Sequence, residues 1–224
     1  MLRAVIFDFD GLILDTELPE YQAWCTIYES HGHSLALETW NQAVGTRDGF
    51  DPYADLQLLT GLTLERAGIR ARRQGLQEEL MRDIVPLPGV VERLDEAAFL
   101  GWEVGLASSS DRAWVAGHLE RHALLHRFDC ICCAVDSGLP AKPDPATYLA
   151  VLRDLGLAAD DAVAFEDSAH GVAAARAAGI RCVAVPNSVT RVSDFSQADL
   201  VVPSLETVTL ATLEAALRGG STSQ

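Results

Sequence analysis

Short apolar runs of strand length alternate with helical patterns along this chain, and this alternation limits its possible folds more than any other feature. Six runs have strand character: Ala4–Phe7, Glu103–Ala107, Cys130–Val135, Ala162–Phe165, Cys182–Val185 and a weaker one at Asp199–Val202. Strands that alternate with helices form βαβ units and parallel sheets. We therefore predict the α/β class, with a doubly wound parallel sheet.

The alternation is interrupted once. After the first strand no further strand pattern appears until residue 103, whereas a βα connection normally takes a few residues. Apolar residues recur at helical spacing over residues 21–28, and a second helical stretch covers about 64–84. We predict a helical cap at residues 16–87, inserted into a core made of residues 1–15 and 88–224.

Composition excludes several classes of protein. The 17 basic and 32 acidic residues give a net charge of -15, which disfavours binding to nucleic acid. The apolar runs are far shorter than the ~20 residues of a membrane span, and the N-terminus does not resemble a secretory signal. The five cysteines match neither a disulfide framework nor a zinc site. We expect a cytoplasmic protein that acts away from membranes, as a monomer or a weak dimer.

Two carboxylates follow the first strand directly. Asp8 and Asp10 would lie at the C-terminal edge of a parallel sheet, where ligands bind. Two carboxylates about 4 Å apart repel by about 4 kcal/mol at an effective dielectric constant of about 20, so the pair needs a shared proton or a cation such as Mg²⁺. Taken alone, the pair would be better explained by an Asx turn and a helix cap.

Other strand ends carry complementary groups. Ser108 and Ser109 follow the second strand and could bind phosphate oxygens, or simply cap the next helix. Lys142, the only lysine in the chain, follows the third strand, and Glu166 and Asp167 follow the fourth. A solvated lysine and a capping acidic pair are the plain alternatives. Together, at successive strand ends, these groups indicate one active site.

The same residues resemble, in order, the four motifs of the haloacid dehalogenase superfamily, in its β-phosphoglucomutase-like branch with a cap after the first motif. The resemblance implies a Rossmann-like catalytic core. It implies that Asp8 is the nucleophile that becomes an aspartyl phosphate, and that Asp10 is the general acid and then the general base. The motif residues are Asp8-Phe-Asp-Gly-Leu-Ile-Leu-Asp15-Thr16, Ser108, Lys142 and Glu166-Asp167.

The resemblance also implies a magnesium site. The ligands would be Asp8, the backbone carbonyl of Asp10, and Asp167, with Glu166 as a further ligand or an outer support. Lys142 would bridge Asp8 and the transferring phosphoryl group. Such an arrangement makes physical sense, because a carboxylate that attacks an anionic phosphate needs its charge offset.

Substrate recognition is less constrained by the sequence. Ser108 and Ser109 would bind the transferring phosphoryl group. Arg47 lies in Gly45-Thr46-Arg47-Asp48, which resembles a cap motif whose arginine binds a second phosphate, although a solvated arginine at a helix start fits equally well. The other cap arginines, residues 70, 72 and 73, are expected to form surface ion pairs with Glu65, Glu78 and Glu79.

The activity predicted is hydrolysis of a small phosphorylated metabolite, most simply a sugar phosphate. Asp10 argues against a dehalogenase, because dehalogenases of this superfamily generally lack that second aspartate. Glu20 stands where β-phosphoglucomutases have a histidine, which favours a phosphatase over the alternative, a phosphomutase. A signalling receiver domain is excluded by the order of the motifs, since its acidic pair follows the first strand and its phosphoacceptor the third.

Overall fold

The sheet has six parallel strands in the order β3-β2-β1-β4-β5-β6, so β1 is central. The computed structural model describes residues 1–46 and 49–219. The order reverses on either side of β1, which confirms the predicted doubly wound α/β sheet. The strands are β1 (Ala4–Phe7), β2 (Glu103–Ser108), β3 (Cys130–Cys133), β4 (Ala162–Glu166), β5 (Arg181–Ala184) and β6 (Leu200–Val201).

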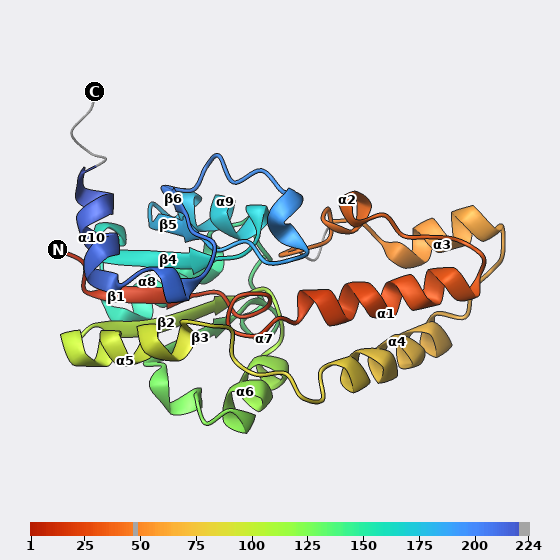
Figure 1. Cartoon of the computed structure of the whole chain (residues 1–224), viewed down its shortest axis with the longest axis horizontal. Helices are drawn as coiled ribbons and strands as arrows, with labels where there is room; N and C mark the ends of the chain where they lie inside the picture. Colours follow the sequence, from red (N-terminus) through yellow and green to blue (C-terminus); the bar gives the residue numbers. More distant parts are fainter. Residues whose placement is uncertain (47–48, 220–224) are drawn as a thin grey trace.

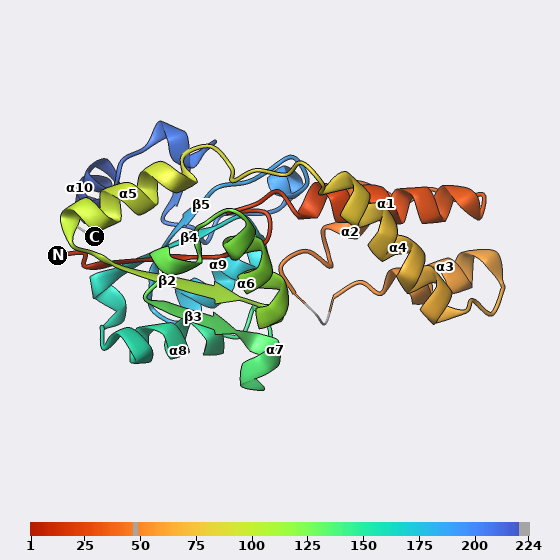
Figure 2. The same cartoon turned by 90° about the horizontal axis from the view of Figure 1, so that it is seen from below.

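Helices cover both faces of this sheet (Figure 2). Alternate residues of β1 point to opposite faces, so Val5 and Phe7 join one hydrophobic cluster and Ala4 and Ile6 the other. The first cluster packs against α5 (Val90–Leu100), α6 (Arg112–Arg121) and α10 (Leu210–Gly219), and the second against α8 (Ala146–Leu155) and α9 (Ala169–Ala177). Shorter helices are α7 (Ala134–Ser137), η1 (Leu125–Arg127), η2 (Ala159–Asp161), η3 (Thr190–Val192) and η4 (Leu205–Thr207).

Three segments differ from the sequence expectation. The third strand ends at Cys133 rather than Val135, because a short helix closed by Gly138 at φ 63° begins there. The apolar pattern over Leu205–Leu217 predicts one closing helix, but the last helix starts at Leu210, after a separate 3₁₀ turn. Helix α5 was not predicted, although Val90, Leu94 and Ala97 place a buried stripe on it.

In the described part of the chain, four of the five helices between β1 and β2 project away from the sheet (Figure 1). A third hydrophobic cluster holds them together: Trp24, Ile27 and Tyr28 pack with Leu56, and Val189 of the core joins the same cluster. We call them the cap; the boundaries at residues 16 and 87 remain predictions. The helices are α1 (Glu17–Ser30), α2 (Leu37–Trp40), α3 (Pro52–Thr60) and α4 (Arg66–Leu80).

The chain enters and leaves the cap through two adjacent segments. Leu14 forms an antiparallel bridge with Pro86, and the Leu87 N–H donates to the Ile13 carbonyl at 2.9 Å. The cap is therefore attached just beyond the C-terminal end of β1. Among the described residues, no helix combines the length and the apolar character that a membrane crossing requires.

Candidate active site

The end of β1 places Asp8 against the end of β4. The Asp8 N–H donates to the Phe165 carbonyl at 3.0 Å, which continues the pairing of the two strands by one residue. The chain then turns at Gly11, whose φ is 74°. A Cβ atom at Gly11 would collide with the Asp167 carboxylate. Glycine therefore lets the β1 turn pack against the acidic pair after β4.

Lys142 joins these two strand ends. Its Nζ forms ion pairs with Oδ1 of Asp8 and, at 2.6 Å, with Oε1 of Glu166. The lysine is only 1% exposed, although it lies in the loop between α7 and α8. The Tyr148 hydroxyl donates to the same Glu166 oxygen at 2.6 Å, and the ammonium lies 5.0 Å from the centre of its ring. Lys142 is thus fixed by contacts from three elements.

Negative charge exceeds positive charge in this buried cluster. One ligand atom each from Asp8, Glu166 and Asp167 lie within 4.8 Å of one another. Burial raises the pKa of Asp8 to about 8. The charge of Lys142 opposes this increase, and the charges of Glu166 and Asp10 add to it. Burial and then the Asp8 charge raise the pKa of Asp167 well above its usual value. Burial alone would lower the pKa of Lys142, but Asp8 and Glu166 raise it.

These residues fit a hard divalent cation such as Mg²⁺. Both oxygens of Glu166 already accept hydrogen bonds, one of them from Ser168 at 3.4 Å. Oδ2 of Asp8 and Oδ1 of Asp167 accept none from the described part of the chain, while Oδ2 of Asp167 is held by Asn187 Nδ2 at 2.8 Å. Two carboxylate oxygens remain for a cation that prefers oxygen ligands, and Glu166 serves better as an outer support.

The serines after β2 lie at the same edge of the sheet. Ser108 is fully buried, and its hydroxyl accepts the Ser110 N–H at 3.0 Å. The Ser109 hydroxyl accepts the Lys142 N–H at 3.2 Å and donates to the carbonyl of Gly45 in the cap at 3.3 Å. The fold therefore brings together every predicted site residue that the structure describes; Arg47 lies outside the described residues. The chemical role assigned to each one remains a prediction.

The Asp10 carboxylate has partners that the sequence reasoning missed. It accepts hydrogen bonds from Thr16, Ser110 and Trp114. Ser110 belongs to the serine run that supplied Ser108 and Ser109, so it could have been included. For Trp114 nothing in the sequence indicates a contact with the first strand.

The cap adds charged groups above this edge. Glu17, at the start of α1, is buried; burial first, and then the charges of Glu20 and Asp10, raise its pKa well above the usual value. Burial also raises the pKa of Glu20, with Arg73 opposing and Asp10 adding to the increase. Asp10 acts on both glutamates, so the start of α1 contributes carboxylates near the strand ends.

One expectation for the cap was wrong. In the described part of the chain, none of the arginines at 70, 72 and 73 forms an ion pair with the three expected glutamates, and Arg72 Nη1 instead donates to the Ser30 hydroxyl at 2.9 Å. Arg73 Nη1 lies 3.0 Å from Oε1 of Glu20 on α1 and 2.6 Å from Oε1 of Gln77. The reason is the packing of α1 against α4, which turns Arg73 inward and leaves its side chain only 17% exposed.

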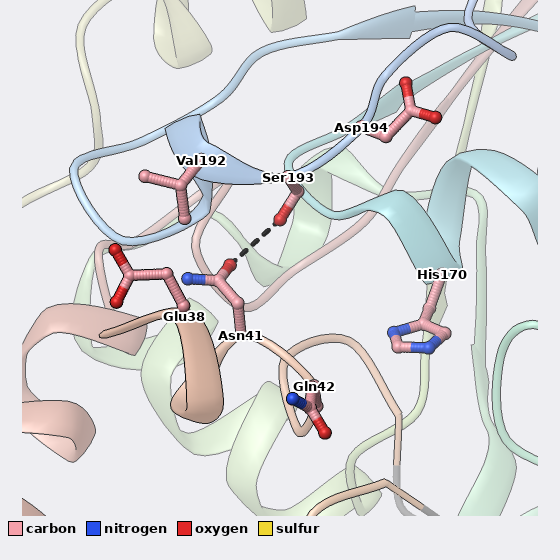
Figure 3. Close-up of a pocket in the computed structure, with 7 residues that line it drawn as sticks. All are labelled: Glu38, Asn41, Gln42, His170, Val192, Ser193 and Asp194. Carbon is pink, nitrogen blue, oxygen red and sulfur yellow. Dashed lines mark hydrogen bonds between the residues drawn. The ribbon is translucent and has the colours of Figure 1, made fainter. Parts of the chain in front are cut away.

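A cleft of about 370 Å³ lies beside the site, between α2 of the cap and the core (Figure 3). The carboxylates at the ends of β1 and β4 are not among the residues that line it. Asn41 crosses it: its Nδ2 donates to the Val189 carbonyl at 2.8 Å, and its Oδ1 accepts the Ser193 hydroxyl at 2.9 Å. His170 Nδ1 lies 2.9 Å from the Val44 carbonyl. These contacts hold the cap segment before Gly45 against the core.

Comparisons with known proteins agree with this geometry. The family model described as haloacid dehalogenase-like hydrolase matches residues 5–185. The protein named "Putative phosphatase YhcW" of Bacillus subtilis (strain 168) is 41% identical over 213 residues, which cover 95% of this chain and 96% of YhcW. The phosphorylated carbohydrates phosphatase of Thermotoga maritima is 31% identical over 182 residues, covering 80% and 82% of the two chains.

A solved structure is similar over almost the whole length. A variant of CbbY from Rhodobacter sphaeroides, crystallised in complex with xylulose-(1,5)bisphosphate, superposes with a TM-score of 0.76 at 27% identity and covers 95% of this chain and 99% of its own. With a matching family model, a relative of 41% identity and the four motifs gathered at one sheet edge, this chain belongs to the haloacid dehalogenase-like hydrolase family.

Proposed function

We propose that this protein is a Mg²⁺-dependent phosphatase that hydrolyses a small phosphorylated sugar through an aspartyl phosphate on Asp8. One observation carries the proposal: Asp8 is buried, paired with the ammonium of Lys142, and next to Glu166 and Asp167. The substrate class is supported by the carbohydrate phosphatase of Thermotoga maritima and by the sugar bisphosphate bound to CbbY.

The first step forms the phosphoenzyme. Oδ1 of Asp8, the oxygen that Lys142 contacts, attacks phosphorus, which leaves Oδ2 for the cation, and the bond from phosphorus to the sugar oxygen breaks. Asp10 donates a proton to that oxygen, so the sugar leaves as an alcohol. Lys142 offsets the charge of the nucleophile and of the phosphoryl group as they approach. Bound at Asp8 and Asp167, Mg²⁺ would supply positive charge to the phosphoryl oxygens.

The second step regenerates the enzyme. Water attacks the phosphorus of the aspartyl phosphate, and Asp10 accepts a proton from that water. The bond between phosphorus and the Asp8 oxygen breaks, and inorganic phosphate leaves. Asp10 has regained the proton that it gave in the first step, so one carboxyl group serves both halves of the reaction.

The proposal is tested by a screen of phosphorylated sugars for released phosphate, with and without Mg²⁺. We expect release from several sugar phosphates and from p-nitrophenyl phosphate, and loss of it on Asp8→Asn. Full activity in that variant would exclude the aspartyl-phosphate mechanism.

The alternative, a phosphomutase, is tested with β-glucose 1-phosphate and a glucose 1,6-bisphosphate primer. Rapid formation of glucose 6-phosphate without release of phosphate would favour that activity. We further propose a cytoplasmic protein that is a monomer or a weak dimer, because the cap could let a single chain close its own site. Cell fractionation and gel filtration would test this.

A further inference from the structure

Three donors from three places bind the Asp10 carboxylate. The Thr16 hydroxyl and the Trp114 indole N–H both donate to Oδ1, at 2.9 and 2.8 Å. The Ser110 hydroxyl donates to Oδ2 at 2.6 Å. A carboxylate oxygen has about two acceptor positions. Oδ1 is therefore saturated by these two donors, whereas Oδ2 keeps one acceptor position beyond Ser110.

Trp114 is itself held in place. Its backbone N–H donates to Oδ1 of Asp111 at 2.8 Å, which caps the start of α6. Its ring makes an edge contact with His118 at 4.4 Å between centroids, and His118 in turn lies 6.2 Å from the ring of Phe9. Phe9 is fully buried between the two aspartates in the sequence. The position of the indole N–H is thus fixed by the helix start and by ring contacts that extend through His118 to Phe9 at the end of β1.

We propose that Trp114 is a positioning residue for Asp10: its indole N–H anchors Oδ1, so that Oδ2 is the oxygen that exchanges the proton with the leaving group and with water. This inference rests on the proposed function, in which Asp10 performs that exchange. Thr16 lies on the cap side of Asp10, and Trp114 lies on the core. Trp114 therefore keeps the carboxyl group oriented relative to the sheet edge.

Trp114→Phe tests the proposal, because phenylalanine keeps an aromatic ring but has no N–H to donate. When the general acid is misoriented, the reaction rate falls more for a more basic leaving group. Phenolate is more basic than p-nitrophenolate and needs the proton more. With Mg²⁺ present, we expect Trp114→Phe to lower kcat/KM for phenyl phosphate about tenfold more than for p-nitrophenyl phosphate.

Trp102→Phe is the matched control, because Trp102 packs against the core away from the site; it should change both values of kcat/KM equally. Thr16→Val removes the other donor to Oδ1 and should shift the two substrates in the same sense as Trp114→Phe, which keeps the test open if the tryptophan variant does not fold. Equal losses for both substrates in the folded Trp114 and Thr16 variants, or no loss, would overturn the inference. Absence of wild-type activity on both substrates would instead overturn the proposed function, and the inference with it.

Discussion

Lys142 in the core and Arg73 in the cap each bridge two polar side chains, but in opposite surroundings. The side chains of Lys142, Asp8 and Glu166 are 1%, 9% and 0% exposed, whereas those of Arg73 and Glu20 are 17% and 35% exposed. Water competes little with the first cluster and considerably with the second. A buried charge that loses its partner cannot be solvated, while a partly exposed one can.

We interpret this difference as a separation of functions, in which the buried core cluster carries out the reaction and the partly exposed cap residues recognise the substrate. Lys142 is held by two carboxylates and by the ring of Tyr148. Arg73 has a flexible stem, and the Glu20 side chain that it contacts is partly exposed to water. We therefore expect changes at the core cluster to affect both stability and turnover, and changes in the cap to affect mainly substrate binding.

The largest effect is expected at Lys142. Lys142→Met leaves two buried carboxylates without their cation and should lower the free energy of unfolding by about 3–5 kcal/mol. Arg73→Met, the matched cap variant, should lower it by about 1 kcal/mol or less. Urea denaturation followed by circular dichroism measures both. Similar losses in the two variants would contradict the comparison.

The Lys142→Arg variant distinguishes the effect of the positive charge at this position on activity from the effect of the shape of the group that carries it. The guanidinium keeps the charge but is a planar fork, whereas the compact ammonium fits between two carboxylates. We expect kcat/KM for p-nitrophenyl phosphate to fall about 100-fold or more. Because Lys142 is fully buried, the larger side chain should also cost about 1–3 kcal/mol of stability through overpacking. Wild-type turnover in this variant would show that any cation suffices.

Magnesium should stabilise the core cluster and leave the cap pair unaffected. At about 100 times its dissociation constant, a ligand of the folded state adds about 2.7 kcal/mol to stability. We expect Mg²⁺ to raise the melting temperature, EDTA to reverse the rise, and Asp167→Asn to remove it. Glu20→Gln should retain the full shift. An equal shift in wild type and Asp167→Asn would place the cation elsewhere.

This stabilisation should depend on pH through Asp8. Its pKa is raised from 3.8 to about 8 without metal, mainly by burial. The stability that the neutral carboxyl contributes is complete below pH 3.8 and is lost as the pH rises through about 8. Mg²⁺ binds the ionised form, so its effect on the melting temperature should be larger at about pH 9 than at about pH 6. A shift that is independent of pH would contradict this assignment.

The core cluster could be predicted from the sequence because each of its parts is local. A strand end is marked by a short apolar run, and the topology of parallel strands then brings the strand ends to one edge. Asp8 and Glu166 lie at the ends of their strands, whereas Lys142, in the loop between α7 and α8, is identified from the order of the four motifs.

The remaining contacts depend on that rotation. The Arg73–Glu20 pair joins residues 53 positions apart on two packed helices, and the Trp114–Asp10 bond spans 104 positions. Helical periodicity identifies the buried face of a helix but not the partner that the face meets. The inward turn of Arg73 follows from the contact between α1 and α4, which the hydrophobic pattern alone does not specify.

Two buried tyrosines, one in the core and one in the cap, allow the two regions to be compared by the same substitution, with a smaller expected effect. Tyr148 donates to Glu166 at 2.6 Å in the core, and Tyr28 donates to Asp55 at 2.8 Å in the cap; both side chains are fully buried. Replacing either by phenylalanine should cost about 1.5–3 kcal/mol of stability, because each hydroxyl binds a carboxylate. Only Tyr148→Phe should also lower kcat with p-nitrophenyl phosphate, since Glu166 holds Lys142. A comparable drop in kcat for Tyr28→Phe would contradict the separation of the two regions.

The smallest effect is expected where the cap touches the core beside the cleft. Asn41→Ala removes the bonds to the Val189 carbonyl and to the Ser193 hydroxyl, both between uncharged groups, so the loss of stability should be about 1 kcal/mol. Because these bonds hold the segment before Gly45 over the site, their loss should raise KM for p-nitrophenyl phosphate about two- to fivefold and leave kcat nearly unchanged. Val192→Ala is the control, since Val192 lines the same cleft through an apolar side chain. If Asn41→Ala lowered kcat and left KM unchanged, this contact would act in the reaction together with the core cluster. That result would contradict the assignment of the cap contacts to substrate binding alone.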